Sequence, residues 1–374
     1  MIILHIVEPF ATGIAVFVKS LTEAMPDDVH IIVHGERSQV MHASEVKKSF
    51  SKSNVRFIKW RSAQRAIDPY KDLLAFSELY KILTRLKRKN LVDAVHLHSS
   101  KSGLLGRIAC KMAGITNVLY TPNGASFLSG KNKFIRFIYR QIERFGNGMG
   151  GKVVCCSESE YEEFLKLGID ASYINNGVGL ADSKKILPVK DPKKFRIVTS
   201  GRISSQKDPL VFNSIAKYFE EFLDFEFIWV GEGERKNLLT ASNITVTGWV
   251  HAAEVKELVS TADIYLSTSL YEGLSFGVLE ALALQKPVLL SGCVGNTDVV
   301  KKGINGDLFD SHSEAVVKIL KYYNNRDMLG VMGNYSGAIC KTEFDANSNF
   351  QHYRQLYSRA IVGLKSKPYK WAFK

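Results

Sequence analysis

Residues 262–290 have the pattern of one βαβ unit. The apolar run from Ala262 to Ser267 is typical of a strand buried on both faces of a parallel sheet. A polar loop with Glu272 follows, then an apolar helix with Glu280, then a second short apolar run at 287–290. Because parallel strands need a crossover connection between them, the pattern predicts an α/β fold.

Small residues stand where this helix begins, namely Gly273, Ser275 and Gly277. The first backbone N–H groups of a helix have no partner within it, and together with the helix dipole they attract phosphate. Beside a phosphate, Glu272 could accept hydrogen bonds from a sugar and Glu280 from a ribose. Two solvated glutamates on an ordinary helix explain the pair equally well, so the pair alone leaves both interpretations open.

The length and composition predict a globular protein of two domains. The chain has 374 residues, of which 45% are hydrophobic and 23% are charged. No apolar run approaches the length of a membrane span, and the first residues lack a basic leader and a cleavage site, so we expect a cytoplasmic protein. Five cysteines without C-x-x-C spacing argue against disulfides and zinc.

The formal net charge of +13 indicates an anionic partner, either nucleic acid, a membrane surface or a phosphorylated substrate. No zinc-finger spacing, RNP-type aromatic motif or basic zipper is present, which argues against nucleic acid. Residues 131–144 combine cations and aromatics at helical spacing, as on a helix that lies on an anionic membrane. A helix packed into the core is the default interpretation of this segment, and the membrane is a minority hypothesis. The basic aromatic tail at 365–374 allows the same two interpretations, a solvated tail or a membrane contact.

In the first half of the chain, three residues follow expected strands. Gly13 comes after a first strand at the N-terminus, and His98 and Asn123 end two later strands. Ligands of open α/β sheets bind at the carboxyl ends of strands, so His98 and Asn123 are candidates for ligand contact. For His98 the alternative is a loop histidine that is hydrogen-bonded to its neighbours. His96 and His98 have the spacing of metal ligands, but no carboxylate or third histidine follows nearby, which argues against a metal site.

Residues 181–194 are polar, contain two prolines and carry no apolar period, so we expect a linker there. A second alternating α/β pattern begins at Phe195, and its first strand is followed by Arg202 and Lys207. Two fixed cations at a strand end suit a diphosphate, although two solvated loop cations are an equal local explanation. The chain has no Asp-x-Asp sequence to hold a divalent ion, which favours binding without a metal.

Taken together, these motifs resemble glycosyltransferase family 4 (GT4), a family of retaining enzymes. The resemblance covers almost the whole chain and rests on the order and spacing of the following motifs: Asn176-Gly177-Val178, Gly201-Arg202 with Lys207, Gly231-Glu232-Gly233-Glu234, Thr247-Gly248-Trp249-Val250, Glu272 and Glu280 with seven residues between them, Gly295-Asn296 and Gly303-x-Asn305-Gly306. Each motif alone is unspecific, but the ordered set is not.

The resemblance implies a GT-B fold, in which two Rossmann-like doubly wound domains face each other across a cleft. The acceptor domain would span residues 1–180 and the donor domain residues 195–344. A C-terminal helix within about 345–374 would pack back on the first domain.

The resemblance also implies roles for individual residues. Arg202, Lys207 and Glu272 would be catalytic, with the two cations on the diphosphate and the acid facing the donor sugar. The remaining donor contacts would come from Gly13, Thr247, Gly248, Trp249, Leu274, Ser275, Phe276 and Glu280, with Glu280 on the ribose and residues 247–249 bordering the base. His98 and Asn123, with Gly13 nearby, would meet the acceptor.

Two positions depart from the pattern of the family. The first turn has Thr12-Gly13 where the family usually has two or more glycines, and Asn123 stands where a histidine is common. Asparagine can hydrogen-bond a sugar hydroxyl but cannot act as a general base near neutral pH. This favours same-face attack, in which the acceptor hydroxyl gives its proton to the leaving phosphate.

The expected function is retaining, metal-independent transfer of a hexosyl or N-acetylhexosaminyl group, without a cofactor. The donor would be a nucleotide sugar, with UDP favoured by the family, and the acceptor a glycan or a polyprenyl-diphosphate-linked saccharide. This places the protein in the synthesis of lipopolysaccharide or capsule, peripheral to the inner face of the plasma membrane. The alternatives are a nucleotide-sugar epimerase of the same fold and a non-catalytic regulator that binds sugar nucleotides.

Overall fold

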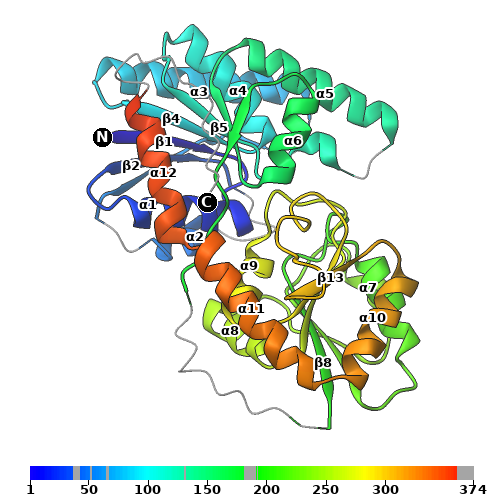
Figure 1. Cartoon of the computed structure of the whole chain (residues 1–374). Coiled ribbons are helices and arrows are strands. Elements are labelled where there is room, and N and C mark those ends of the chain that lie inside the picture. The colour runs from blue at the N-terminus through cyan, green and yellow to red at the C-terminus, as the bar shows by residue number, and fades with distance from the viewer. Residues whose placement is uncertain are drawn as a thin grey trace. The chain divides into compact units, whose positions relative to one another are not determined.

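The computed structural model divides the chain into two compact units (Figure 1). Unit 1 contains Met1–Asn176 and the segment from Ala346 onward, and unit 2 contains Gly177–Asp345. The structure describes residues 1–36, 43–50, 53–64, 67–129, 132–180, 191 and 193–359. Most of the expected linker at 181–194 therefore lies outside the described residues, as does the basic tail.

Strands and helices alternate along unit 1, as the apolar runs predict. Its strands are β1 (Ile2–Val7), β2 (Val29–His34), β3 (Val55–Lys59), β4 (Ala94–His98), β5 (Val118–Thr121), β6 (Lys152–Cys155) and β7 (Ala171–Tyr173). Its helices are α1 (Thr12–Ala24), α2 (Ala43–Lys48), α3 (Pro69–Arg88), α4 (Ser100–Met112), the 3₁₀ turn η1 (Ser126–Leu128), α5 (Lys133–Gly148), α6 (Glu158–Lys166) and α12 (Ala346–Arg359).

Unit 2 repeats the alternation. Its strands are β8 (Phe195–Ser200), β9 (Phe225–Val230), β10 (Ile244–Val246), β11 (Ile264–Ser267), β12 (Val288–Ser291) and β13 (Gly306–Phe309). Its helices are α7 (Pro209–Tyr218), the 3₁₀ turn η2 (Lys236–Leu238), α8 (Ala252–Ser260), α9 (Phe276–Ala283), α10 (His312–Asn324) and α11 (Asp327–Glu343).

Both sheets have the strand order of a doubly wound fold. In the described residues, the order is β3-β2-β1-β4-β5-β6-β7 in unit 1 and β10-β9-β8-β11-β12-β13 in unit 2, and the pairings are parallel. The order reverses between β1 and β4 and again between β8 and β11, and ligands of such sheets bind at this reversal. The prediction of two Rossmann-like α/β domains is confirmed.

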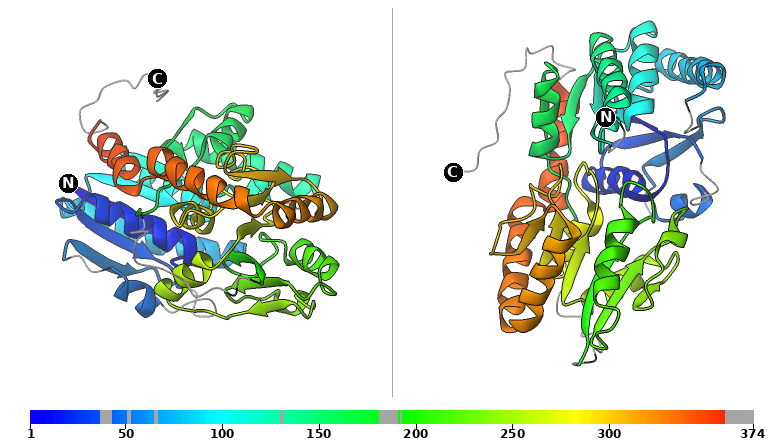
Figure 2. Two further views of the ribbon diagram at one scale, coloured as in Figure 1. Left: turned by 60° about the horizontal axis from the view of Figure 1, so that its bottom comes forward. Right: turned by 90° about the vertical axis from the view of Figure 1, so that its right-hand side faces the viewer.

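The last helix returns to unit 1, where α12 packs beside α1 (Figure 2). Arg354 donates to the buried carboxylate of Asp28 at 3.0 Å, and the side chain of Gln351 donates to the carbonyl of Ala24 at 2.7 Å. The buried rings of Phe350 and Tyr353 contact Phe17 of α1. These contacts attach α12 to the sheet through both polar and apolar groups.

Four fully buried histidines lie on one face of the unit 1 sheet, at positions 5, 30, 96 and 98. Side chains alternate between the two faces of a strand, and the neighbours Leu4, Ile31 and Leu97 join the core on the opposite face. Ring nitrogens of His5, His96 and His98 lie within 4.8 Å of one another. The premise that His96 and His98 have no third histidine nearby is therefore wrong in three dimensions, because β1 pairs with β4.

Hydrogen bonds determine the tautomers of three of these rings. The carbonyl of Met25 can only accept, so His30 Nε2 donates to it at 3.1 Å. His30 Nδ1 then accepts from His5 Nε2 at 3.0 Å, and His5 Nδ1 accepts from His98 Nε2 at 3.1 Å. His96 hydrogen-bonds to Tyr357 of α12 and to Thr121. Both nitrogens of His5 and of His96 thus have protein partners. A neutral imidazole has one donor and one acceptor nitrogen, which accounts for this pattern.

This layer predicts that unit 1 loses stability in acid. Burial lowers the pKa of His5, His96 and His98 below the ordinary value, so the unfolded chain binds protons first as the pH falls. The stability is complete above about pH 6.5 and decreases below it, by up to about 1.4 kcal/mol per pH unit for each group. Thermal unfolding at pH 7.5 and 5.5 measures the decrease.

The matched variants are His5→Gln, which removes one buried imidazole, and His251→Gln, which removes an exposed one. His5→Gln should reduce the dependence of stability on pH, whereas His251→Gln should leave this dependence unchanged. If the stability of His5→Gln and of wild type depended on pH identically, the buried histidines would not be the cause of the loss in acid.

Candidate functional site

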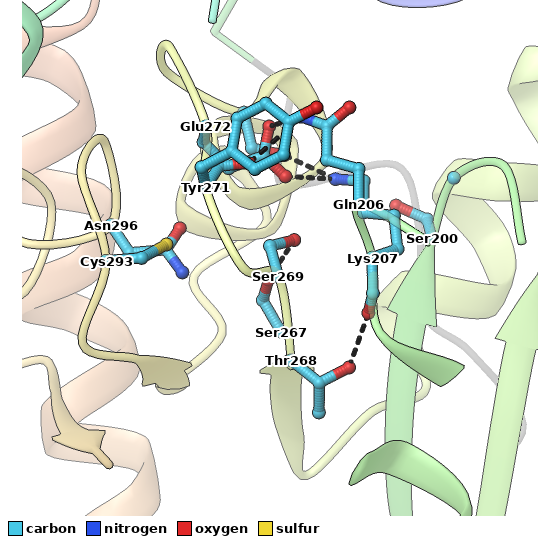
Figure 3. Close-up of polar contacts among 12 residues, drawn as sticks. Ser200, Gln206, Lys207, Ser267, Thr268, Ser269, Tyr271, Glu272, Cys293 and Asn296 are labelled. Carbon is cyan, nitrogen blue, oxygen red and sulfur yellow. Dashed lines mark hydrogen bonds and ion pairs between the residues drawn. The ribbon is translucent and has the colours of Figure 1, made fainter. Parts of the chain in front are cut away.

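Three loops meet at the carboxyl edge of the unit 2 sheet. They follow β8, β11 and β12, which are neighbours in the order β8-β11-β12. Figure 3 shows polar side chains from all three loops, with Lys207 from the first, Glu272 from the second and Asn296 from the third. The site therefore lies at the reversal of strand order, where parallel α/β sheets bind ligands.

An ion pair joins the first two loops. Lys207 Nζ lies 2.7 Å from Glu272 Oε1 and donates to Ser275 Oγ at 3.3 Å. The side chains of Lys207 and Glu272 are 19% and 9% exposed. An ammonium has three N–H donors, so these two contacts leave one N–H of Lys207 for another acceptor.

Further hydrogen bonds hold the loops in register. The Gln206 amide donates to the carbonyl of Tyr271 at 2.9 Å, and the carbonyl of Gln206 accepts from the N–H of Leu270 at 2.8 Å. Thr268 Oγ1 donates to the carbonyl of Lys207 at 2.7 Å. The loop after β12 joins them, because Glu272 N–H donates to its backbone at Val294 O, 3.1 Å away. These hydrogen bonds fix the backbone positions from which the side chains of Lys207 and Glu272 extend.

The electrostatics keep Lys207 charged. Burial acts to lower the pKa of Lys207, but the carboxylate of Glu272 and the hydroxyl of Tyr265 outweigh it, and the pKa is raised. Burial, together with Glu272, raises the pKa of the nearby Cys293 thiol to about 12, so this sulfur stays protonated and unreactive at neutral pH. The site thus carries a permanent cation at its centre.

Helix α9 begins beside this cation. Its N-cap is Ser275, whose side chain makes no capping hydrogen bond and instead accepts from Lys207. Gly277 lets the helix approach β8 closely, since a Cβ there would lie 2.6 Å from Ser200 Oγ and 2.7 Å from the Tyr265 hydroxyl. Helix N–H groups and an ammonium are therefore close together, which suits an anion such as phosphate.

Four other residues predicted to bind the donor also lie in unit 2, namely Leu274, Phe276, Glu280 and Arg202. Leu274 is buried and Phe276 is half-buried, next to Ser275 in the chain. Glu280 lies in α9, where burial raises the pKa of its carboxyl against the effect of Lys256. Arg202 is half-buried in the loop after β8.

The segment at 247–249 lies apart from the ion pair, after the edge strand β10. Thr247 is held by a backbone bond to the carbonyl of Trp229 at 3.1 Å, and Gly248 has φ +73°. The Trp249 side chain is 44% exposed, so its ring has a free surface. None of the described hydrogen bonds or ion pairs connects this segment to Lys207 or Glu272 directly.

Comparison with known proteins identifies the family. The model described as Glycosyltransferase Family 4 matches residues 11–182, and that described as Glycosyl transferases group 1 matches residues 194–325. UDP-Gal:alpha-D-GlcNAc-diphosphoundecaprenol alpha-1,3-galactosyltransferase of Escherichia coli is 32% identical over 286 residues, which are 68% of this chain and 72% of that protein. The chain belongs to glycosyltransferase family 4. It is therefore a glycosyltransferase.

Other members of the family are more distant. N,N'-diacetylbacillosaminyl-diphospho-undecaprenol alpha-1,3-N-acetylgalactosaminyltransferase of Campylobacter jejuni is 22% identical over 338 residues, which are 82% of this chain and 86% of that protein. Among solved structures, sucrose-phosphate synthase from Thermosynechococcus elongatus matches with a TM-score of 0.78 at 16% identity, covering 97% of this chain and 99% of that one. The likeness shows that this glycosyltransferase has the GT-B fold.

The three residues predicted in unit 1 lie at one edge of its sheet. Gly13 is exposed in the first turn of α1, and Asn123 is half-buried with φ +55° in the loop after β5. His98 ends β4 but is fully buried, and within the described residues its Nδ1 has no hydrogen-bond partner. These roles in the glycosyltransferase stay predictions.

Sequence reasoning missed two groups of the glycosyltransferase that hold site loops. Gln206 directly precedes Lys207, so its position next to a candidate residue was the available signal. Glu160 lies in the first turn of α6, where its own N–H donates to the capping hydroxyl of Ser157 at 3.2 Å. Its carboxylate also reaches a neighbouring loop, and nothing in the local sequence indicates that contact.

The ion pair predicts a stability change that can be separated from catalysis. Lys207→Met leaves the poorly exposed carboxylate of Glu272 without its cation and should lower the free energy of unfolding by about 1–3 kcal/mol. Lys207→Met with Glu272→Gln should cost less than the sum of the two single changes, because the pair is coupled. Urea unfolding followed by tryptophan fluorescence measures these values.

Lys236→Met is the matched control, since Lys236 pairs with Glu232 at side-chain exposures of 50% and 33%. It should change the free energy of unfolding by less than about 0.5 kcal/mol. Additive single changes at Lys207 and Glu272 would contradict the coupling.

Proposed function

We propose that this glycosyltransferase moves a hexosyl or N-acetylhexosaminyl group from a UDP-sugar to a polyprenyl-diphosphate-linked saccharide, with retention and without a metal, in the synthesis of a bacterial surface polysaccharide. The observation that carries the proposal is the Lys207–Glu272 pair at the start of α9. It presents a cation, helix N–H groups and a carboxylate side by side, and these match the diphosphate and the sugar hydroxyls of one nucleotide sugar.

Support for the donor comes from the site and from relatives. The free N–H of Lys207 and the guanidinium of Arg202 could each bind a phosphate oxygen, which would neutralise the leaving diphosphate without a divalent ion. UDP is named in the donor of the Escherichia coli relative, and HepE of Anabaena, with the same fold at 16% identity, was solved with UDP-glucose.

Support for the acceptor comes from the names of relatives. The Escherichia coli and Campylobacter jejuni enzymes both act on a saccharide linked to undecaprenol through a diphosphate. Both names also describe alpha-1,3 transfer, of galactose in the first enzyme and of N-acetylgalactosamine in the second. We therefore propose an acceptor of this chemical class, with Asn123 hydrogen-bonding a hydroxyl of its saccharide.

The proposed mechanism relies on charge and position rather than on a general base. The acceptor hydroxyl attacks the anomeric carbon from the face that the diphosphate leaves, and its proton passes to the departing phosphate oxygen. Lys207, Arg202 and the first N–H groups of α9 stabilise the charge that develops on that phosphate. Glu272 holds the donor sugar, and Glu280 binds the ribose.

The test is transfer of radiolabelled galactose from UDP-galactose to N-acetylglucosaminyl-diphosphoundecaprenol. We expect transfer in EDTA, and a loss of about a hundredfold in turnover for Lys207→Ala, because one contact to the leaving-group charge is worth roughly 3 kcal/mol. Asn123→Ala should reduce turnover less than Lys207→Ala does. Because the sugar is a proposal, UDP-glucose and the two UDP-N-acetylhexosamines are assayed in parallel.

The alternatives give different outcomes in the same assay. An epimerase would convert the UDP-sugar with no acceptor present, and a regulator would bind it and leave it unchanged. Near-normal turnover of Lys207→Ala would contradict the assignment of the diphosphate to this cation.

We also propose that the protein acts on an anionic membrane surface, which helix α5 would contact. Its aromatic and aliphatic side chains Phe134, Phe137, Ile138 and Phe145 are 70%, 57%, 40% and 57% exposed. At 3.6 residues per turn these positions form one stripe, and Lys133, Arg136, Arg140 and Arg144 form a second stripe beside it. An exposed apolar stripe flanked by cations is the pattern of a helix that lies in a membrane interface. No described helix is long and apolar enough to cross a membrane.

The third face of α5 is fixed to the core of unit 1. Glu143 accepts from Arg107 at 3.0 Å and from the hydroxyl of Tyr120 at 2.9 Å, and all three side chains are buried. The guanidinium of Arg107 also lies over the Tyr120 ring, 4.4 Å from its centroid. Because α5 is held on this side, its apolar stripe stays exposed rather than rotating inward.

The membrane proposal predicts binding to vesicles that contain phosphatidylglycerol, decreasing as salt is added. Arg136→Glu with Arg140→Glu should weaken vesicle binding at least about tenfold, since each cation near the surface contributes about 1 kcal/mol. Lys81→Glu with Arg88→Glu on α3 makes the same change in net charge and is the control. Equal losses in the two double variants would contradict a specific role for α5, as would no binding at any salt concentration.

A further inference from the structure

Glu160 is a fully buried acid of α6 whose carboxylate is surrounded by hydrogen-bond donors. Its Oε1 accepts from the backbone N–H of Gly124 at 2.9 Å and of Ala125 at 3.0 Å. Its Oε2 accepts from the N–H of Cys156 at 3.1 Å and from the thiol of Cys156 at 3.3 Å. The acid therefore joins the loop after β5 to the loop after β6.

The same contacts extend to a third loop. The carbonyl of Cys156 accepts from the N–H of Asn176, 3.1 Å away, in the segment after β7. Strands β5, β6 and β7 are neighbours in the sheet, so the contacts of Glu160 and Cys156 connect the loops of three consecutive strands. Asn123 immediately precedes Gly124 and is half-buried.

A carboxylate is the side chain that this position requires. Three backbone N–H groups and one thiol converge on it, and a group with four acceptor positions and no donor satisfies all of them. Burying a charge is costly unless it is well hydrogen-bonded, so the arrangement is stable only while the loop after β5 supplies its two N–H groups.

The loop needs this support because of its backbone. Asn123 has φ +55° and Gly124 has φ +89°. Glycine adopts this left-handed conformation freely, whereas Asn123 takes a conformation that non-glycine residues seldom adopt. Among the described residues, the Asn123 side chain makes two long contacts: Nδ2 donates to the carbonyl of Thr121 at 3.2 Å, and Oδ1 accepts from the Cys156 thiol at 3.8 Å. The N–H contacts to Glu160 therefore fix the direction in which Asn123 points.

We infer that Glu160 is a positioning residue for acceptor binding: without touching substrate, it holds the loop that presents Asn123 to the acceptor saccharide. The inference rests on the proposed function, in which Asn123 hydrogen-bonds that saccharide. Displacement of a contacting group by about 1 Å can cost about a hundredfold in rate. The loss falls on the acceptor alone, because the proposed donor contacts of the ion pair lie in unit 2.

The test compares Glu160→Gln with Glu158→Gln, a change of an exposed acid on the same helix. A glutamine side chain has one acceptor oxygen and one NH₂ group. In Glu160→Gln this NH₂ group faces either the two N–H donors of the loop after β5 or the two donors of Cys156, and cannot accept from them.

We expect amide exchange at residues 122–126 to become at least about tenfold faster in Glu160→Gln. With UDP-galactose and N-acetylglucosaminyl-diphosphoundecaprenol, or the UDP-sugar that the wild type uses, kcat/KM for the acceptor should fall about a hundredfold. KM for the donor and the affinity for UDP should stay within twofold. Glu158→Gln should match wild type throughout.

A purely structural role would give a different pattern. Faster exchange in Glu160→Gln with an unchanged kcat/KM for the acceptor would overturn the inference, as would equal losses for donor and acceptor. If Glu160→Gln is too unstable to purify, Glu160→Asp replaces it, because it keeps the charge and shortens the side chain. The inference then requires the same result, a lower kcat/KM for the acceptor with an unchanged KM for the donor. If wild type binds UDP but transfers sugar to no lipid-linked acceptor, the proposed function fails and the acceptor role fails with it. Exchange would still differ between wild type and Glu160→Gln, which distinguishes that failure from an error about the loop.

Discussion

Parallel strand pairing is the constraint on which the rest of this structure depends. When every paired strand of a sheet runs in one direction, the loops at their carboxyl ends gather along one edge. In unit 2 the order reverses between β8 and β11, which brings Lys207 within 2.7 Å of Glu272 although 65 positions separate them in the chain. The ion pair, the start of α9 and the hydrogen bonds of Gln206 all follow from this one adjacency.

The buried polar groups of unit 1 show how differently the same fold can accommodate charge. The guanidinium of Arg107 compensates the charge of Glu143, and backbone N–H groups and a thiol hydrogen-bond Glu160. The buried histidines remain neutral, because burial lowers their pKa. Each solution has its own consequence. The Arg107 pair fixes a helix, the N–H cluster fixes a loop, and the neutral layer, which contacts α12 through Tyr357, is predicted to make stability depend on pH.

Much of this organisation could be predicted from local sequence. Apolar runs located strands, helical periodicity located α5, and cations or acids placed just after strands indicated Lys207 and Glu272 as candidates. The rest depends on which strands are neighbours, and local periodicity does not contain that information. His5 is 91 residues from His96, and only the pairing of β1 with β4 makes them part of one layer. Glu160 stands in the first turn of α6, yet its carboxylate contacts the loops after β5 and β6. The C-terminal helix expected within about 345–374 is described from Ala346 to Arg359.

The number of donors on Lys207 connects the geometry to the proposed chemistry. Because an ammonium carries three N–H groups and only two contact Glu272 and Ser275, a phosphate can bind the third without breaking the ion pair. Glu272 then keeps one oxygen on the ammonium, and its second oxygen, 3.4 Å from the Gln206 amide, can exchange that weak contact for a sugar hydroxyl. A donor that binds in this way needs no rearrangement of the charged groups. The cation is then already in place when negative charge develops on the leaving phosphate, which is the condition for strong electrostatic stabilisation.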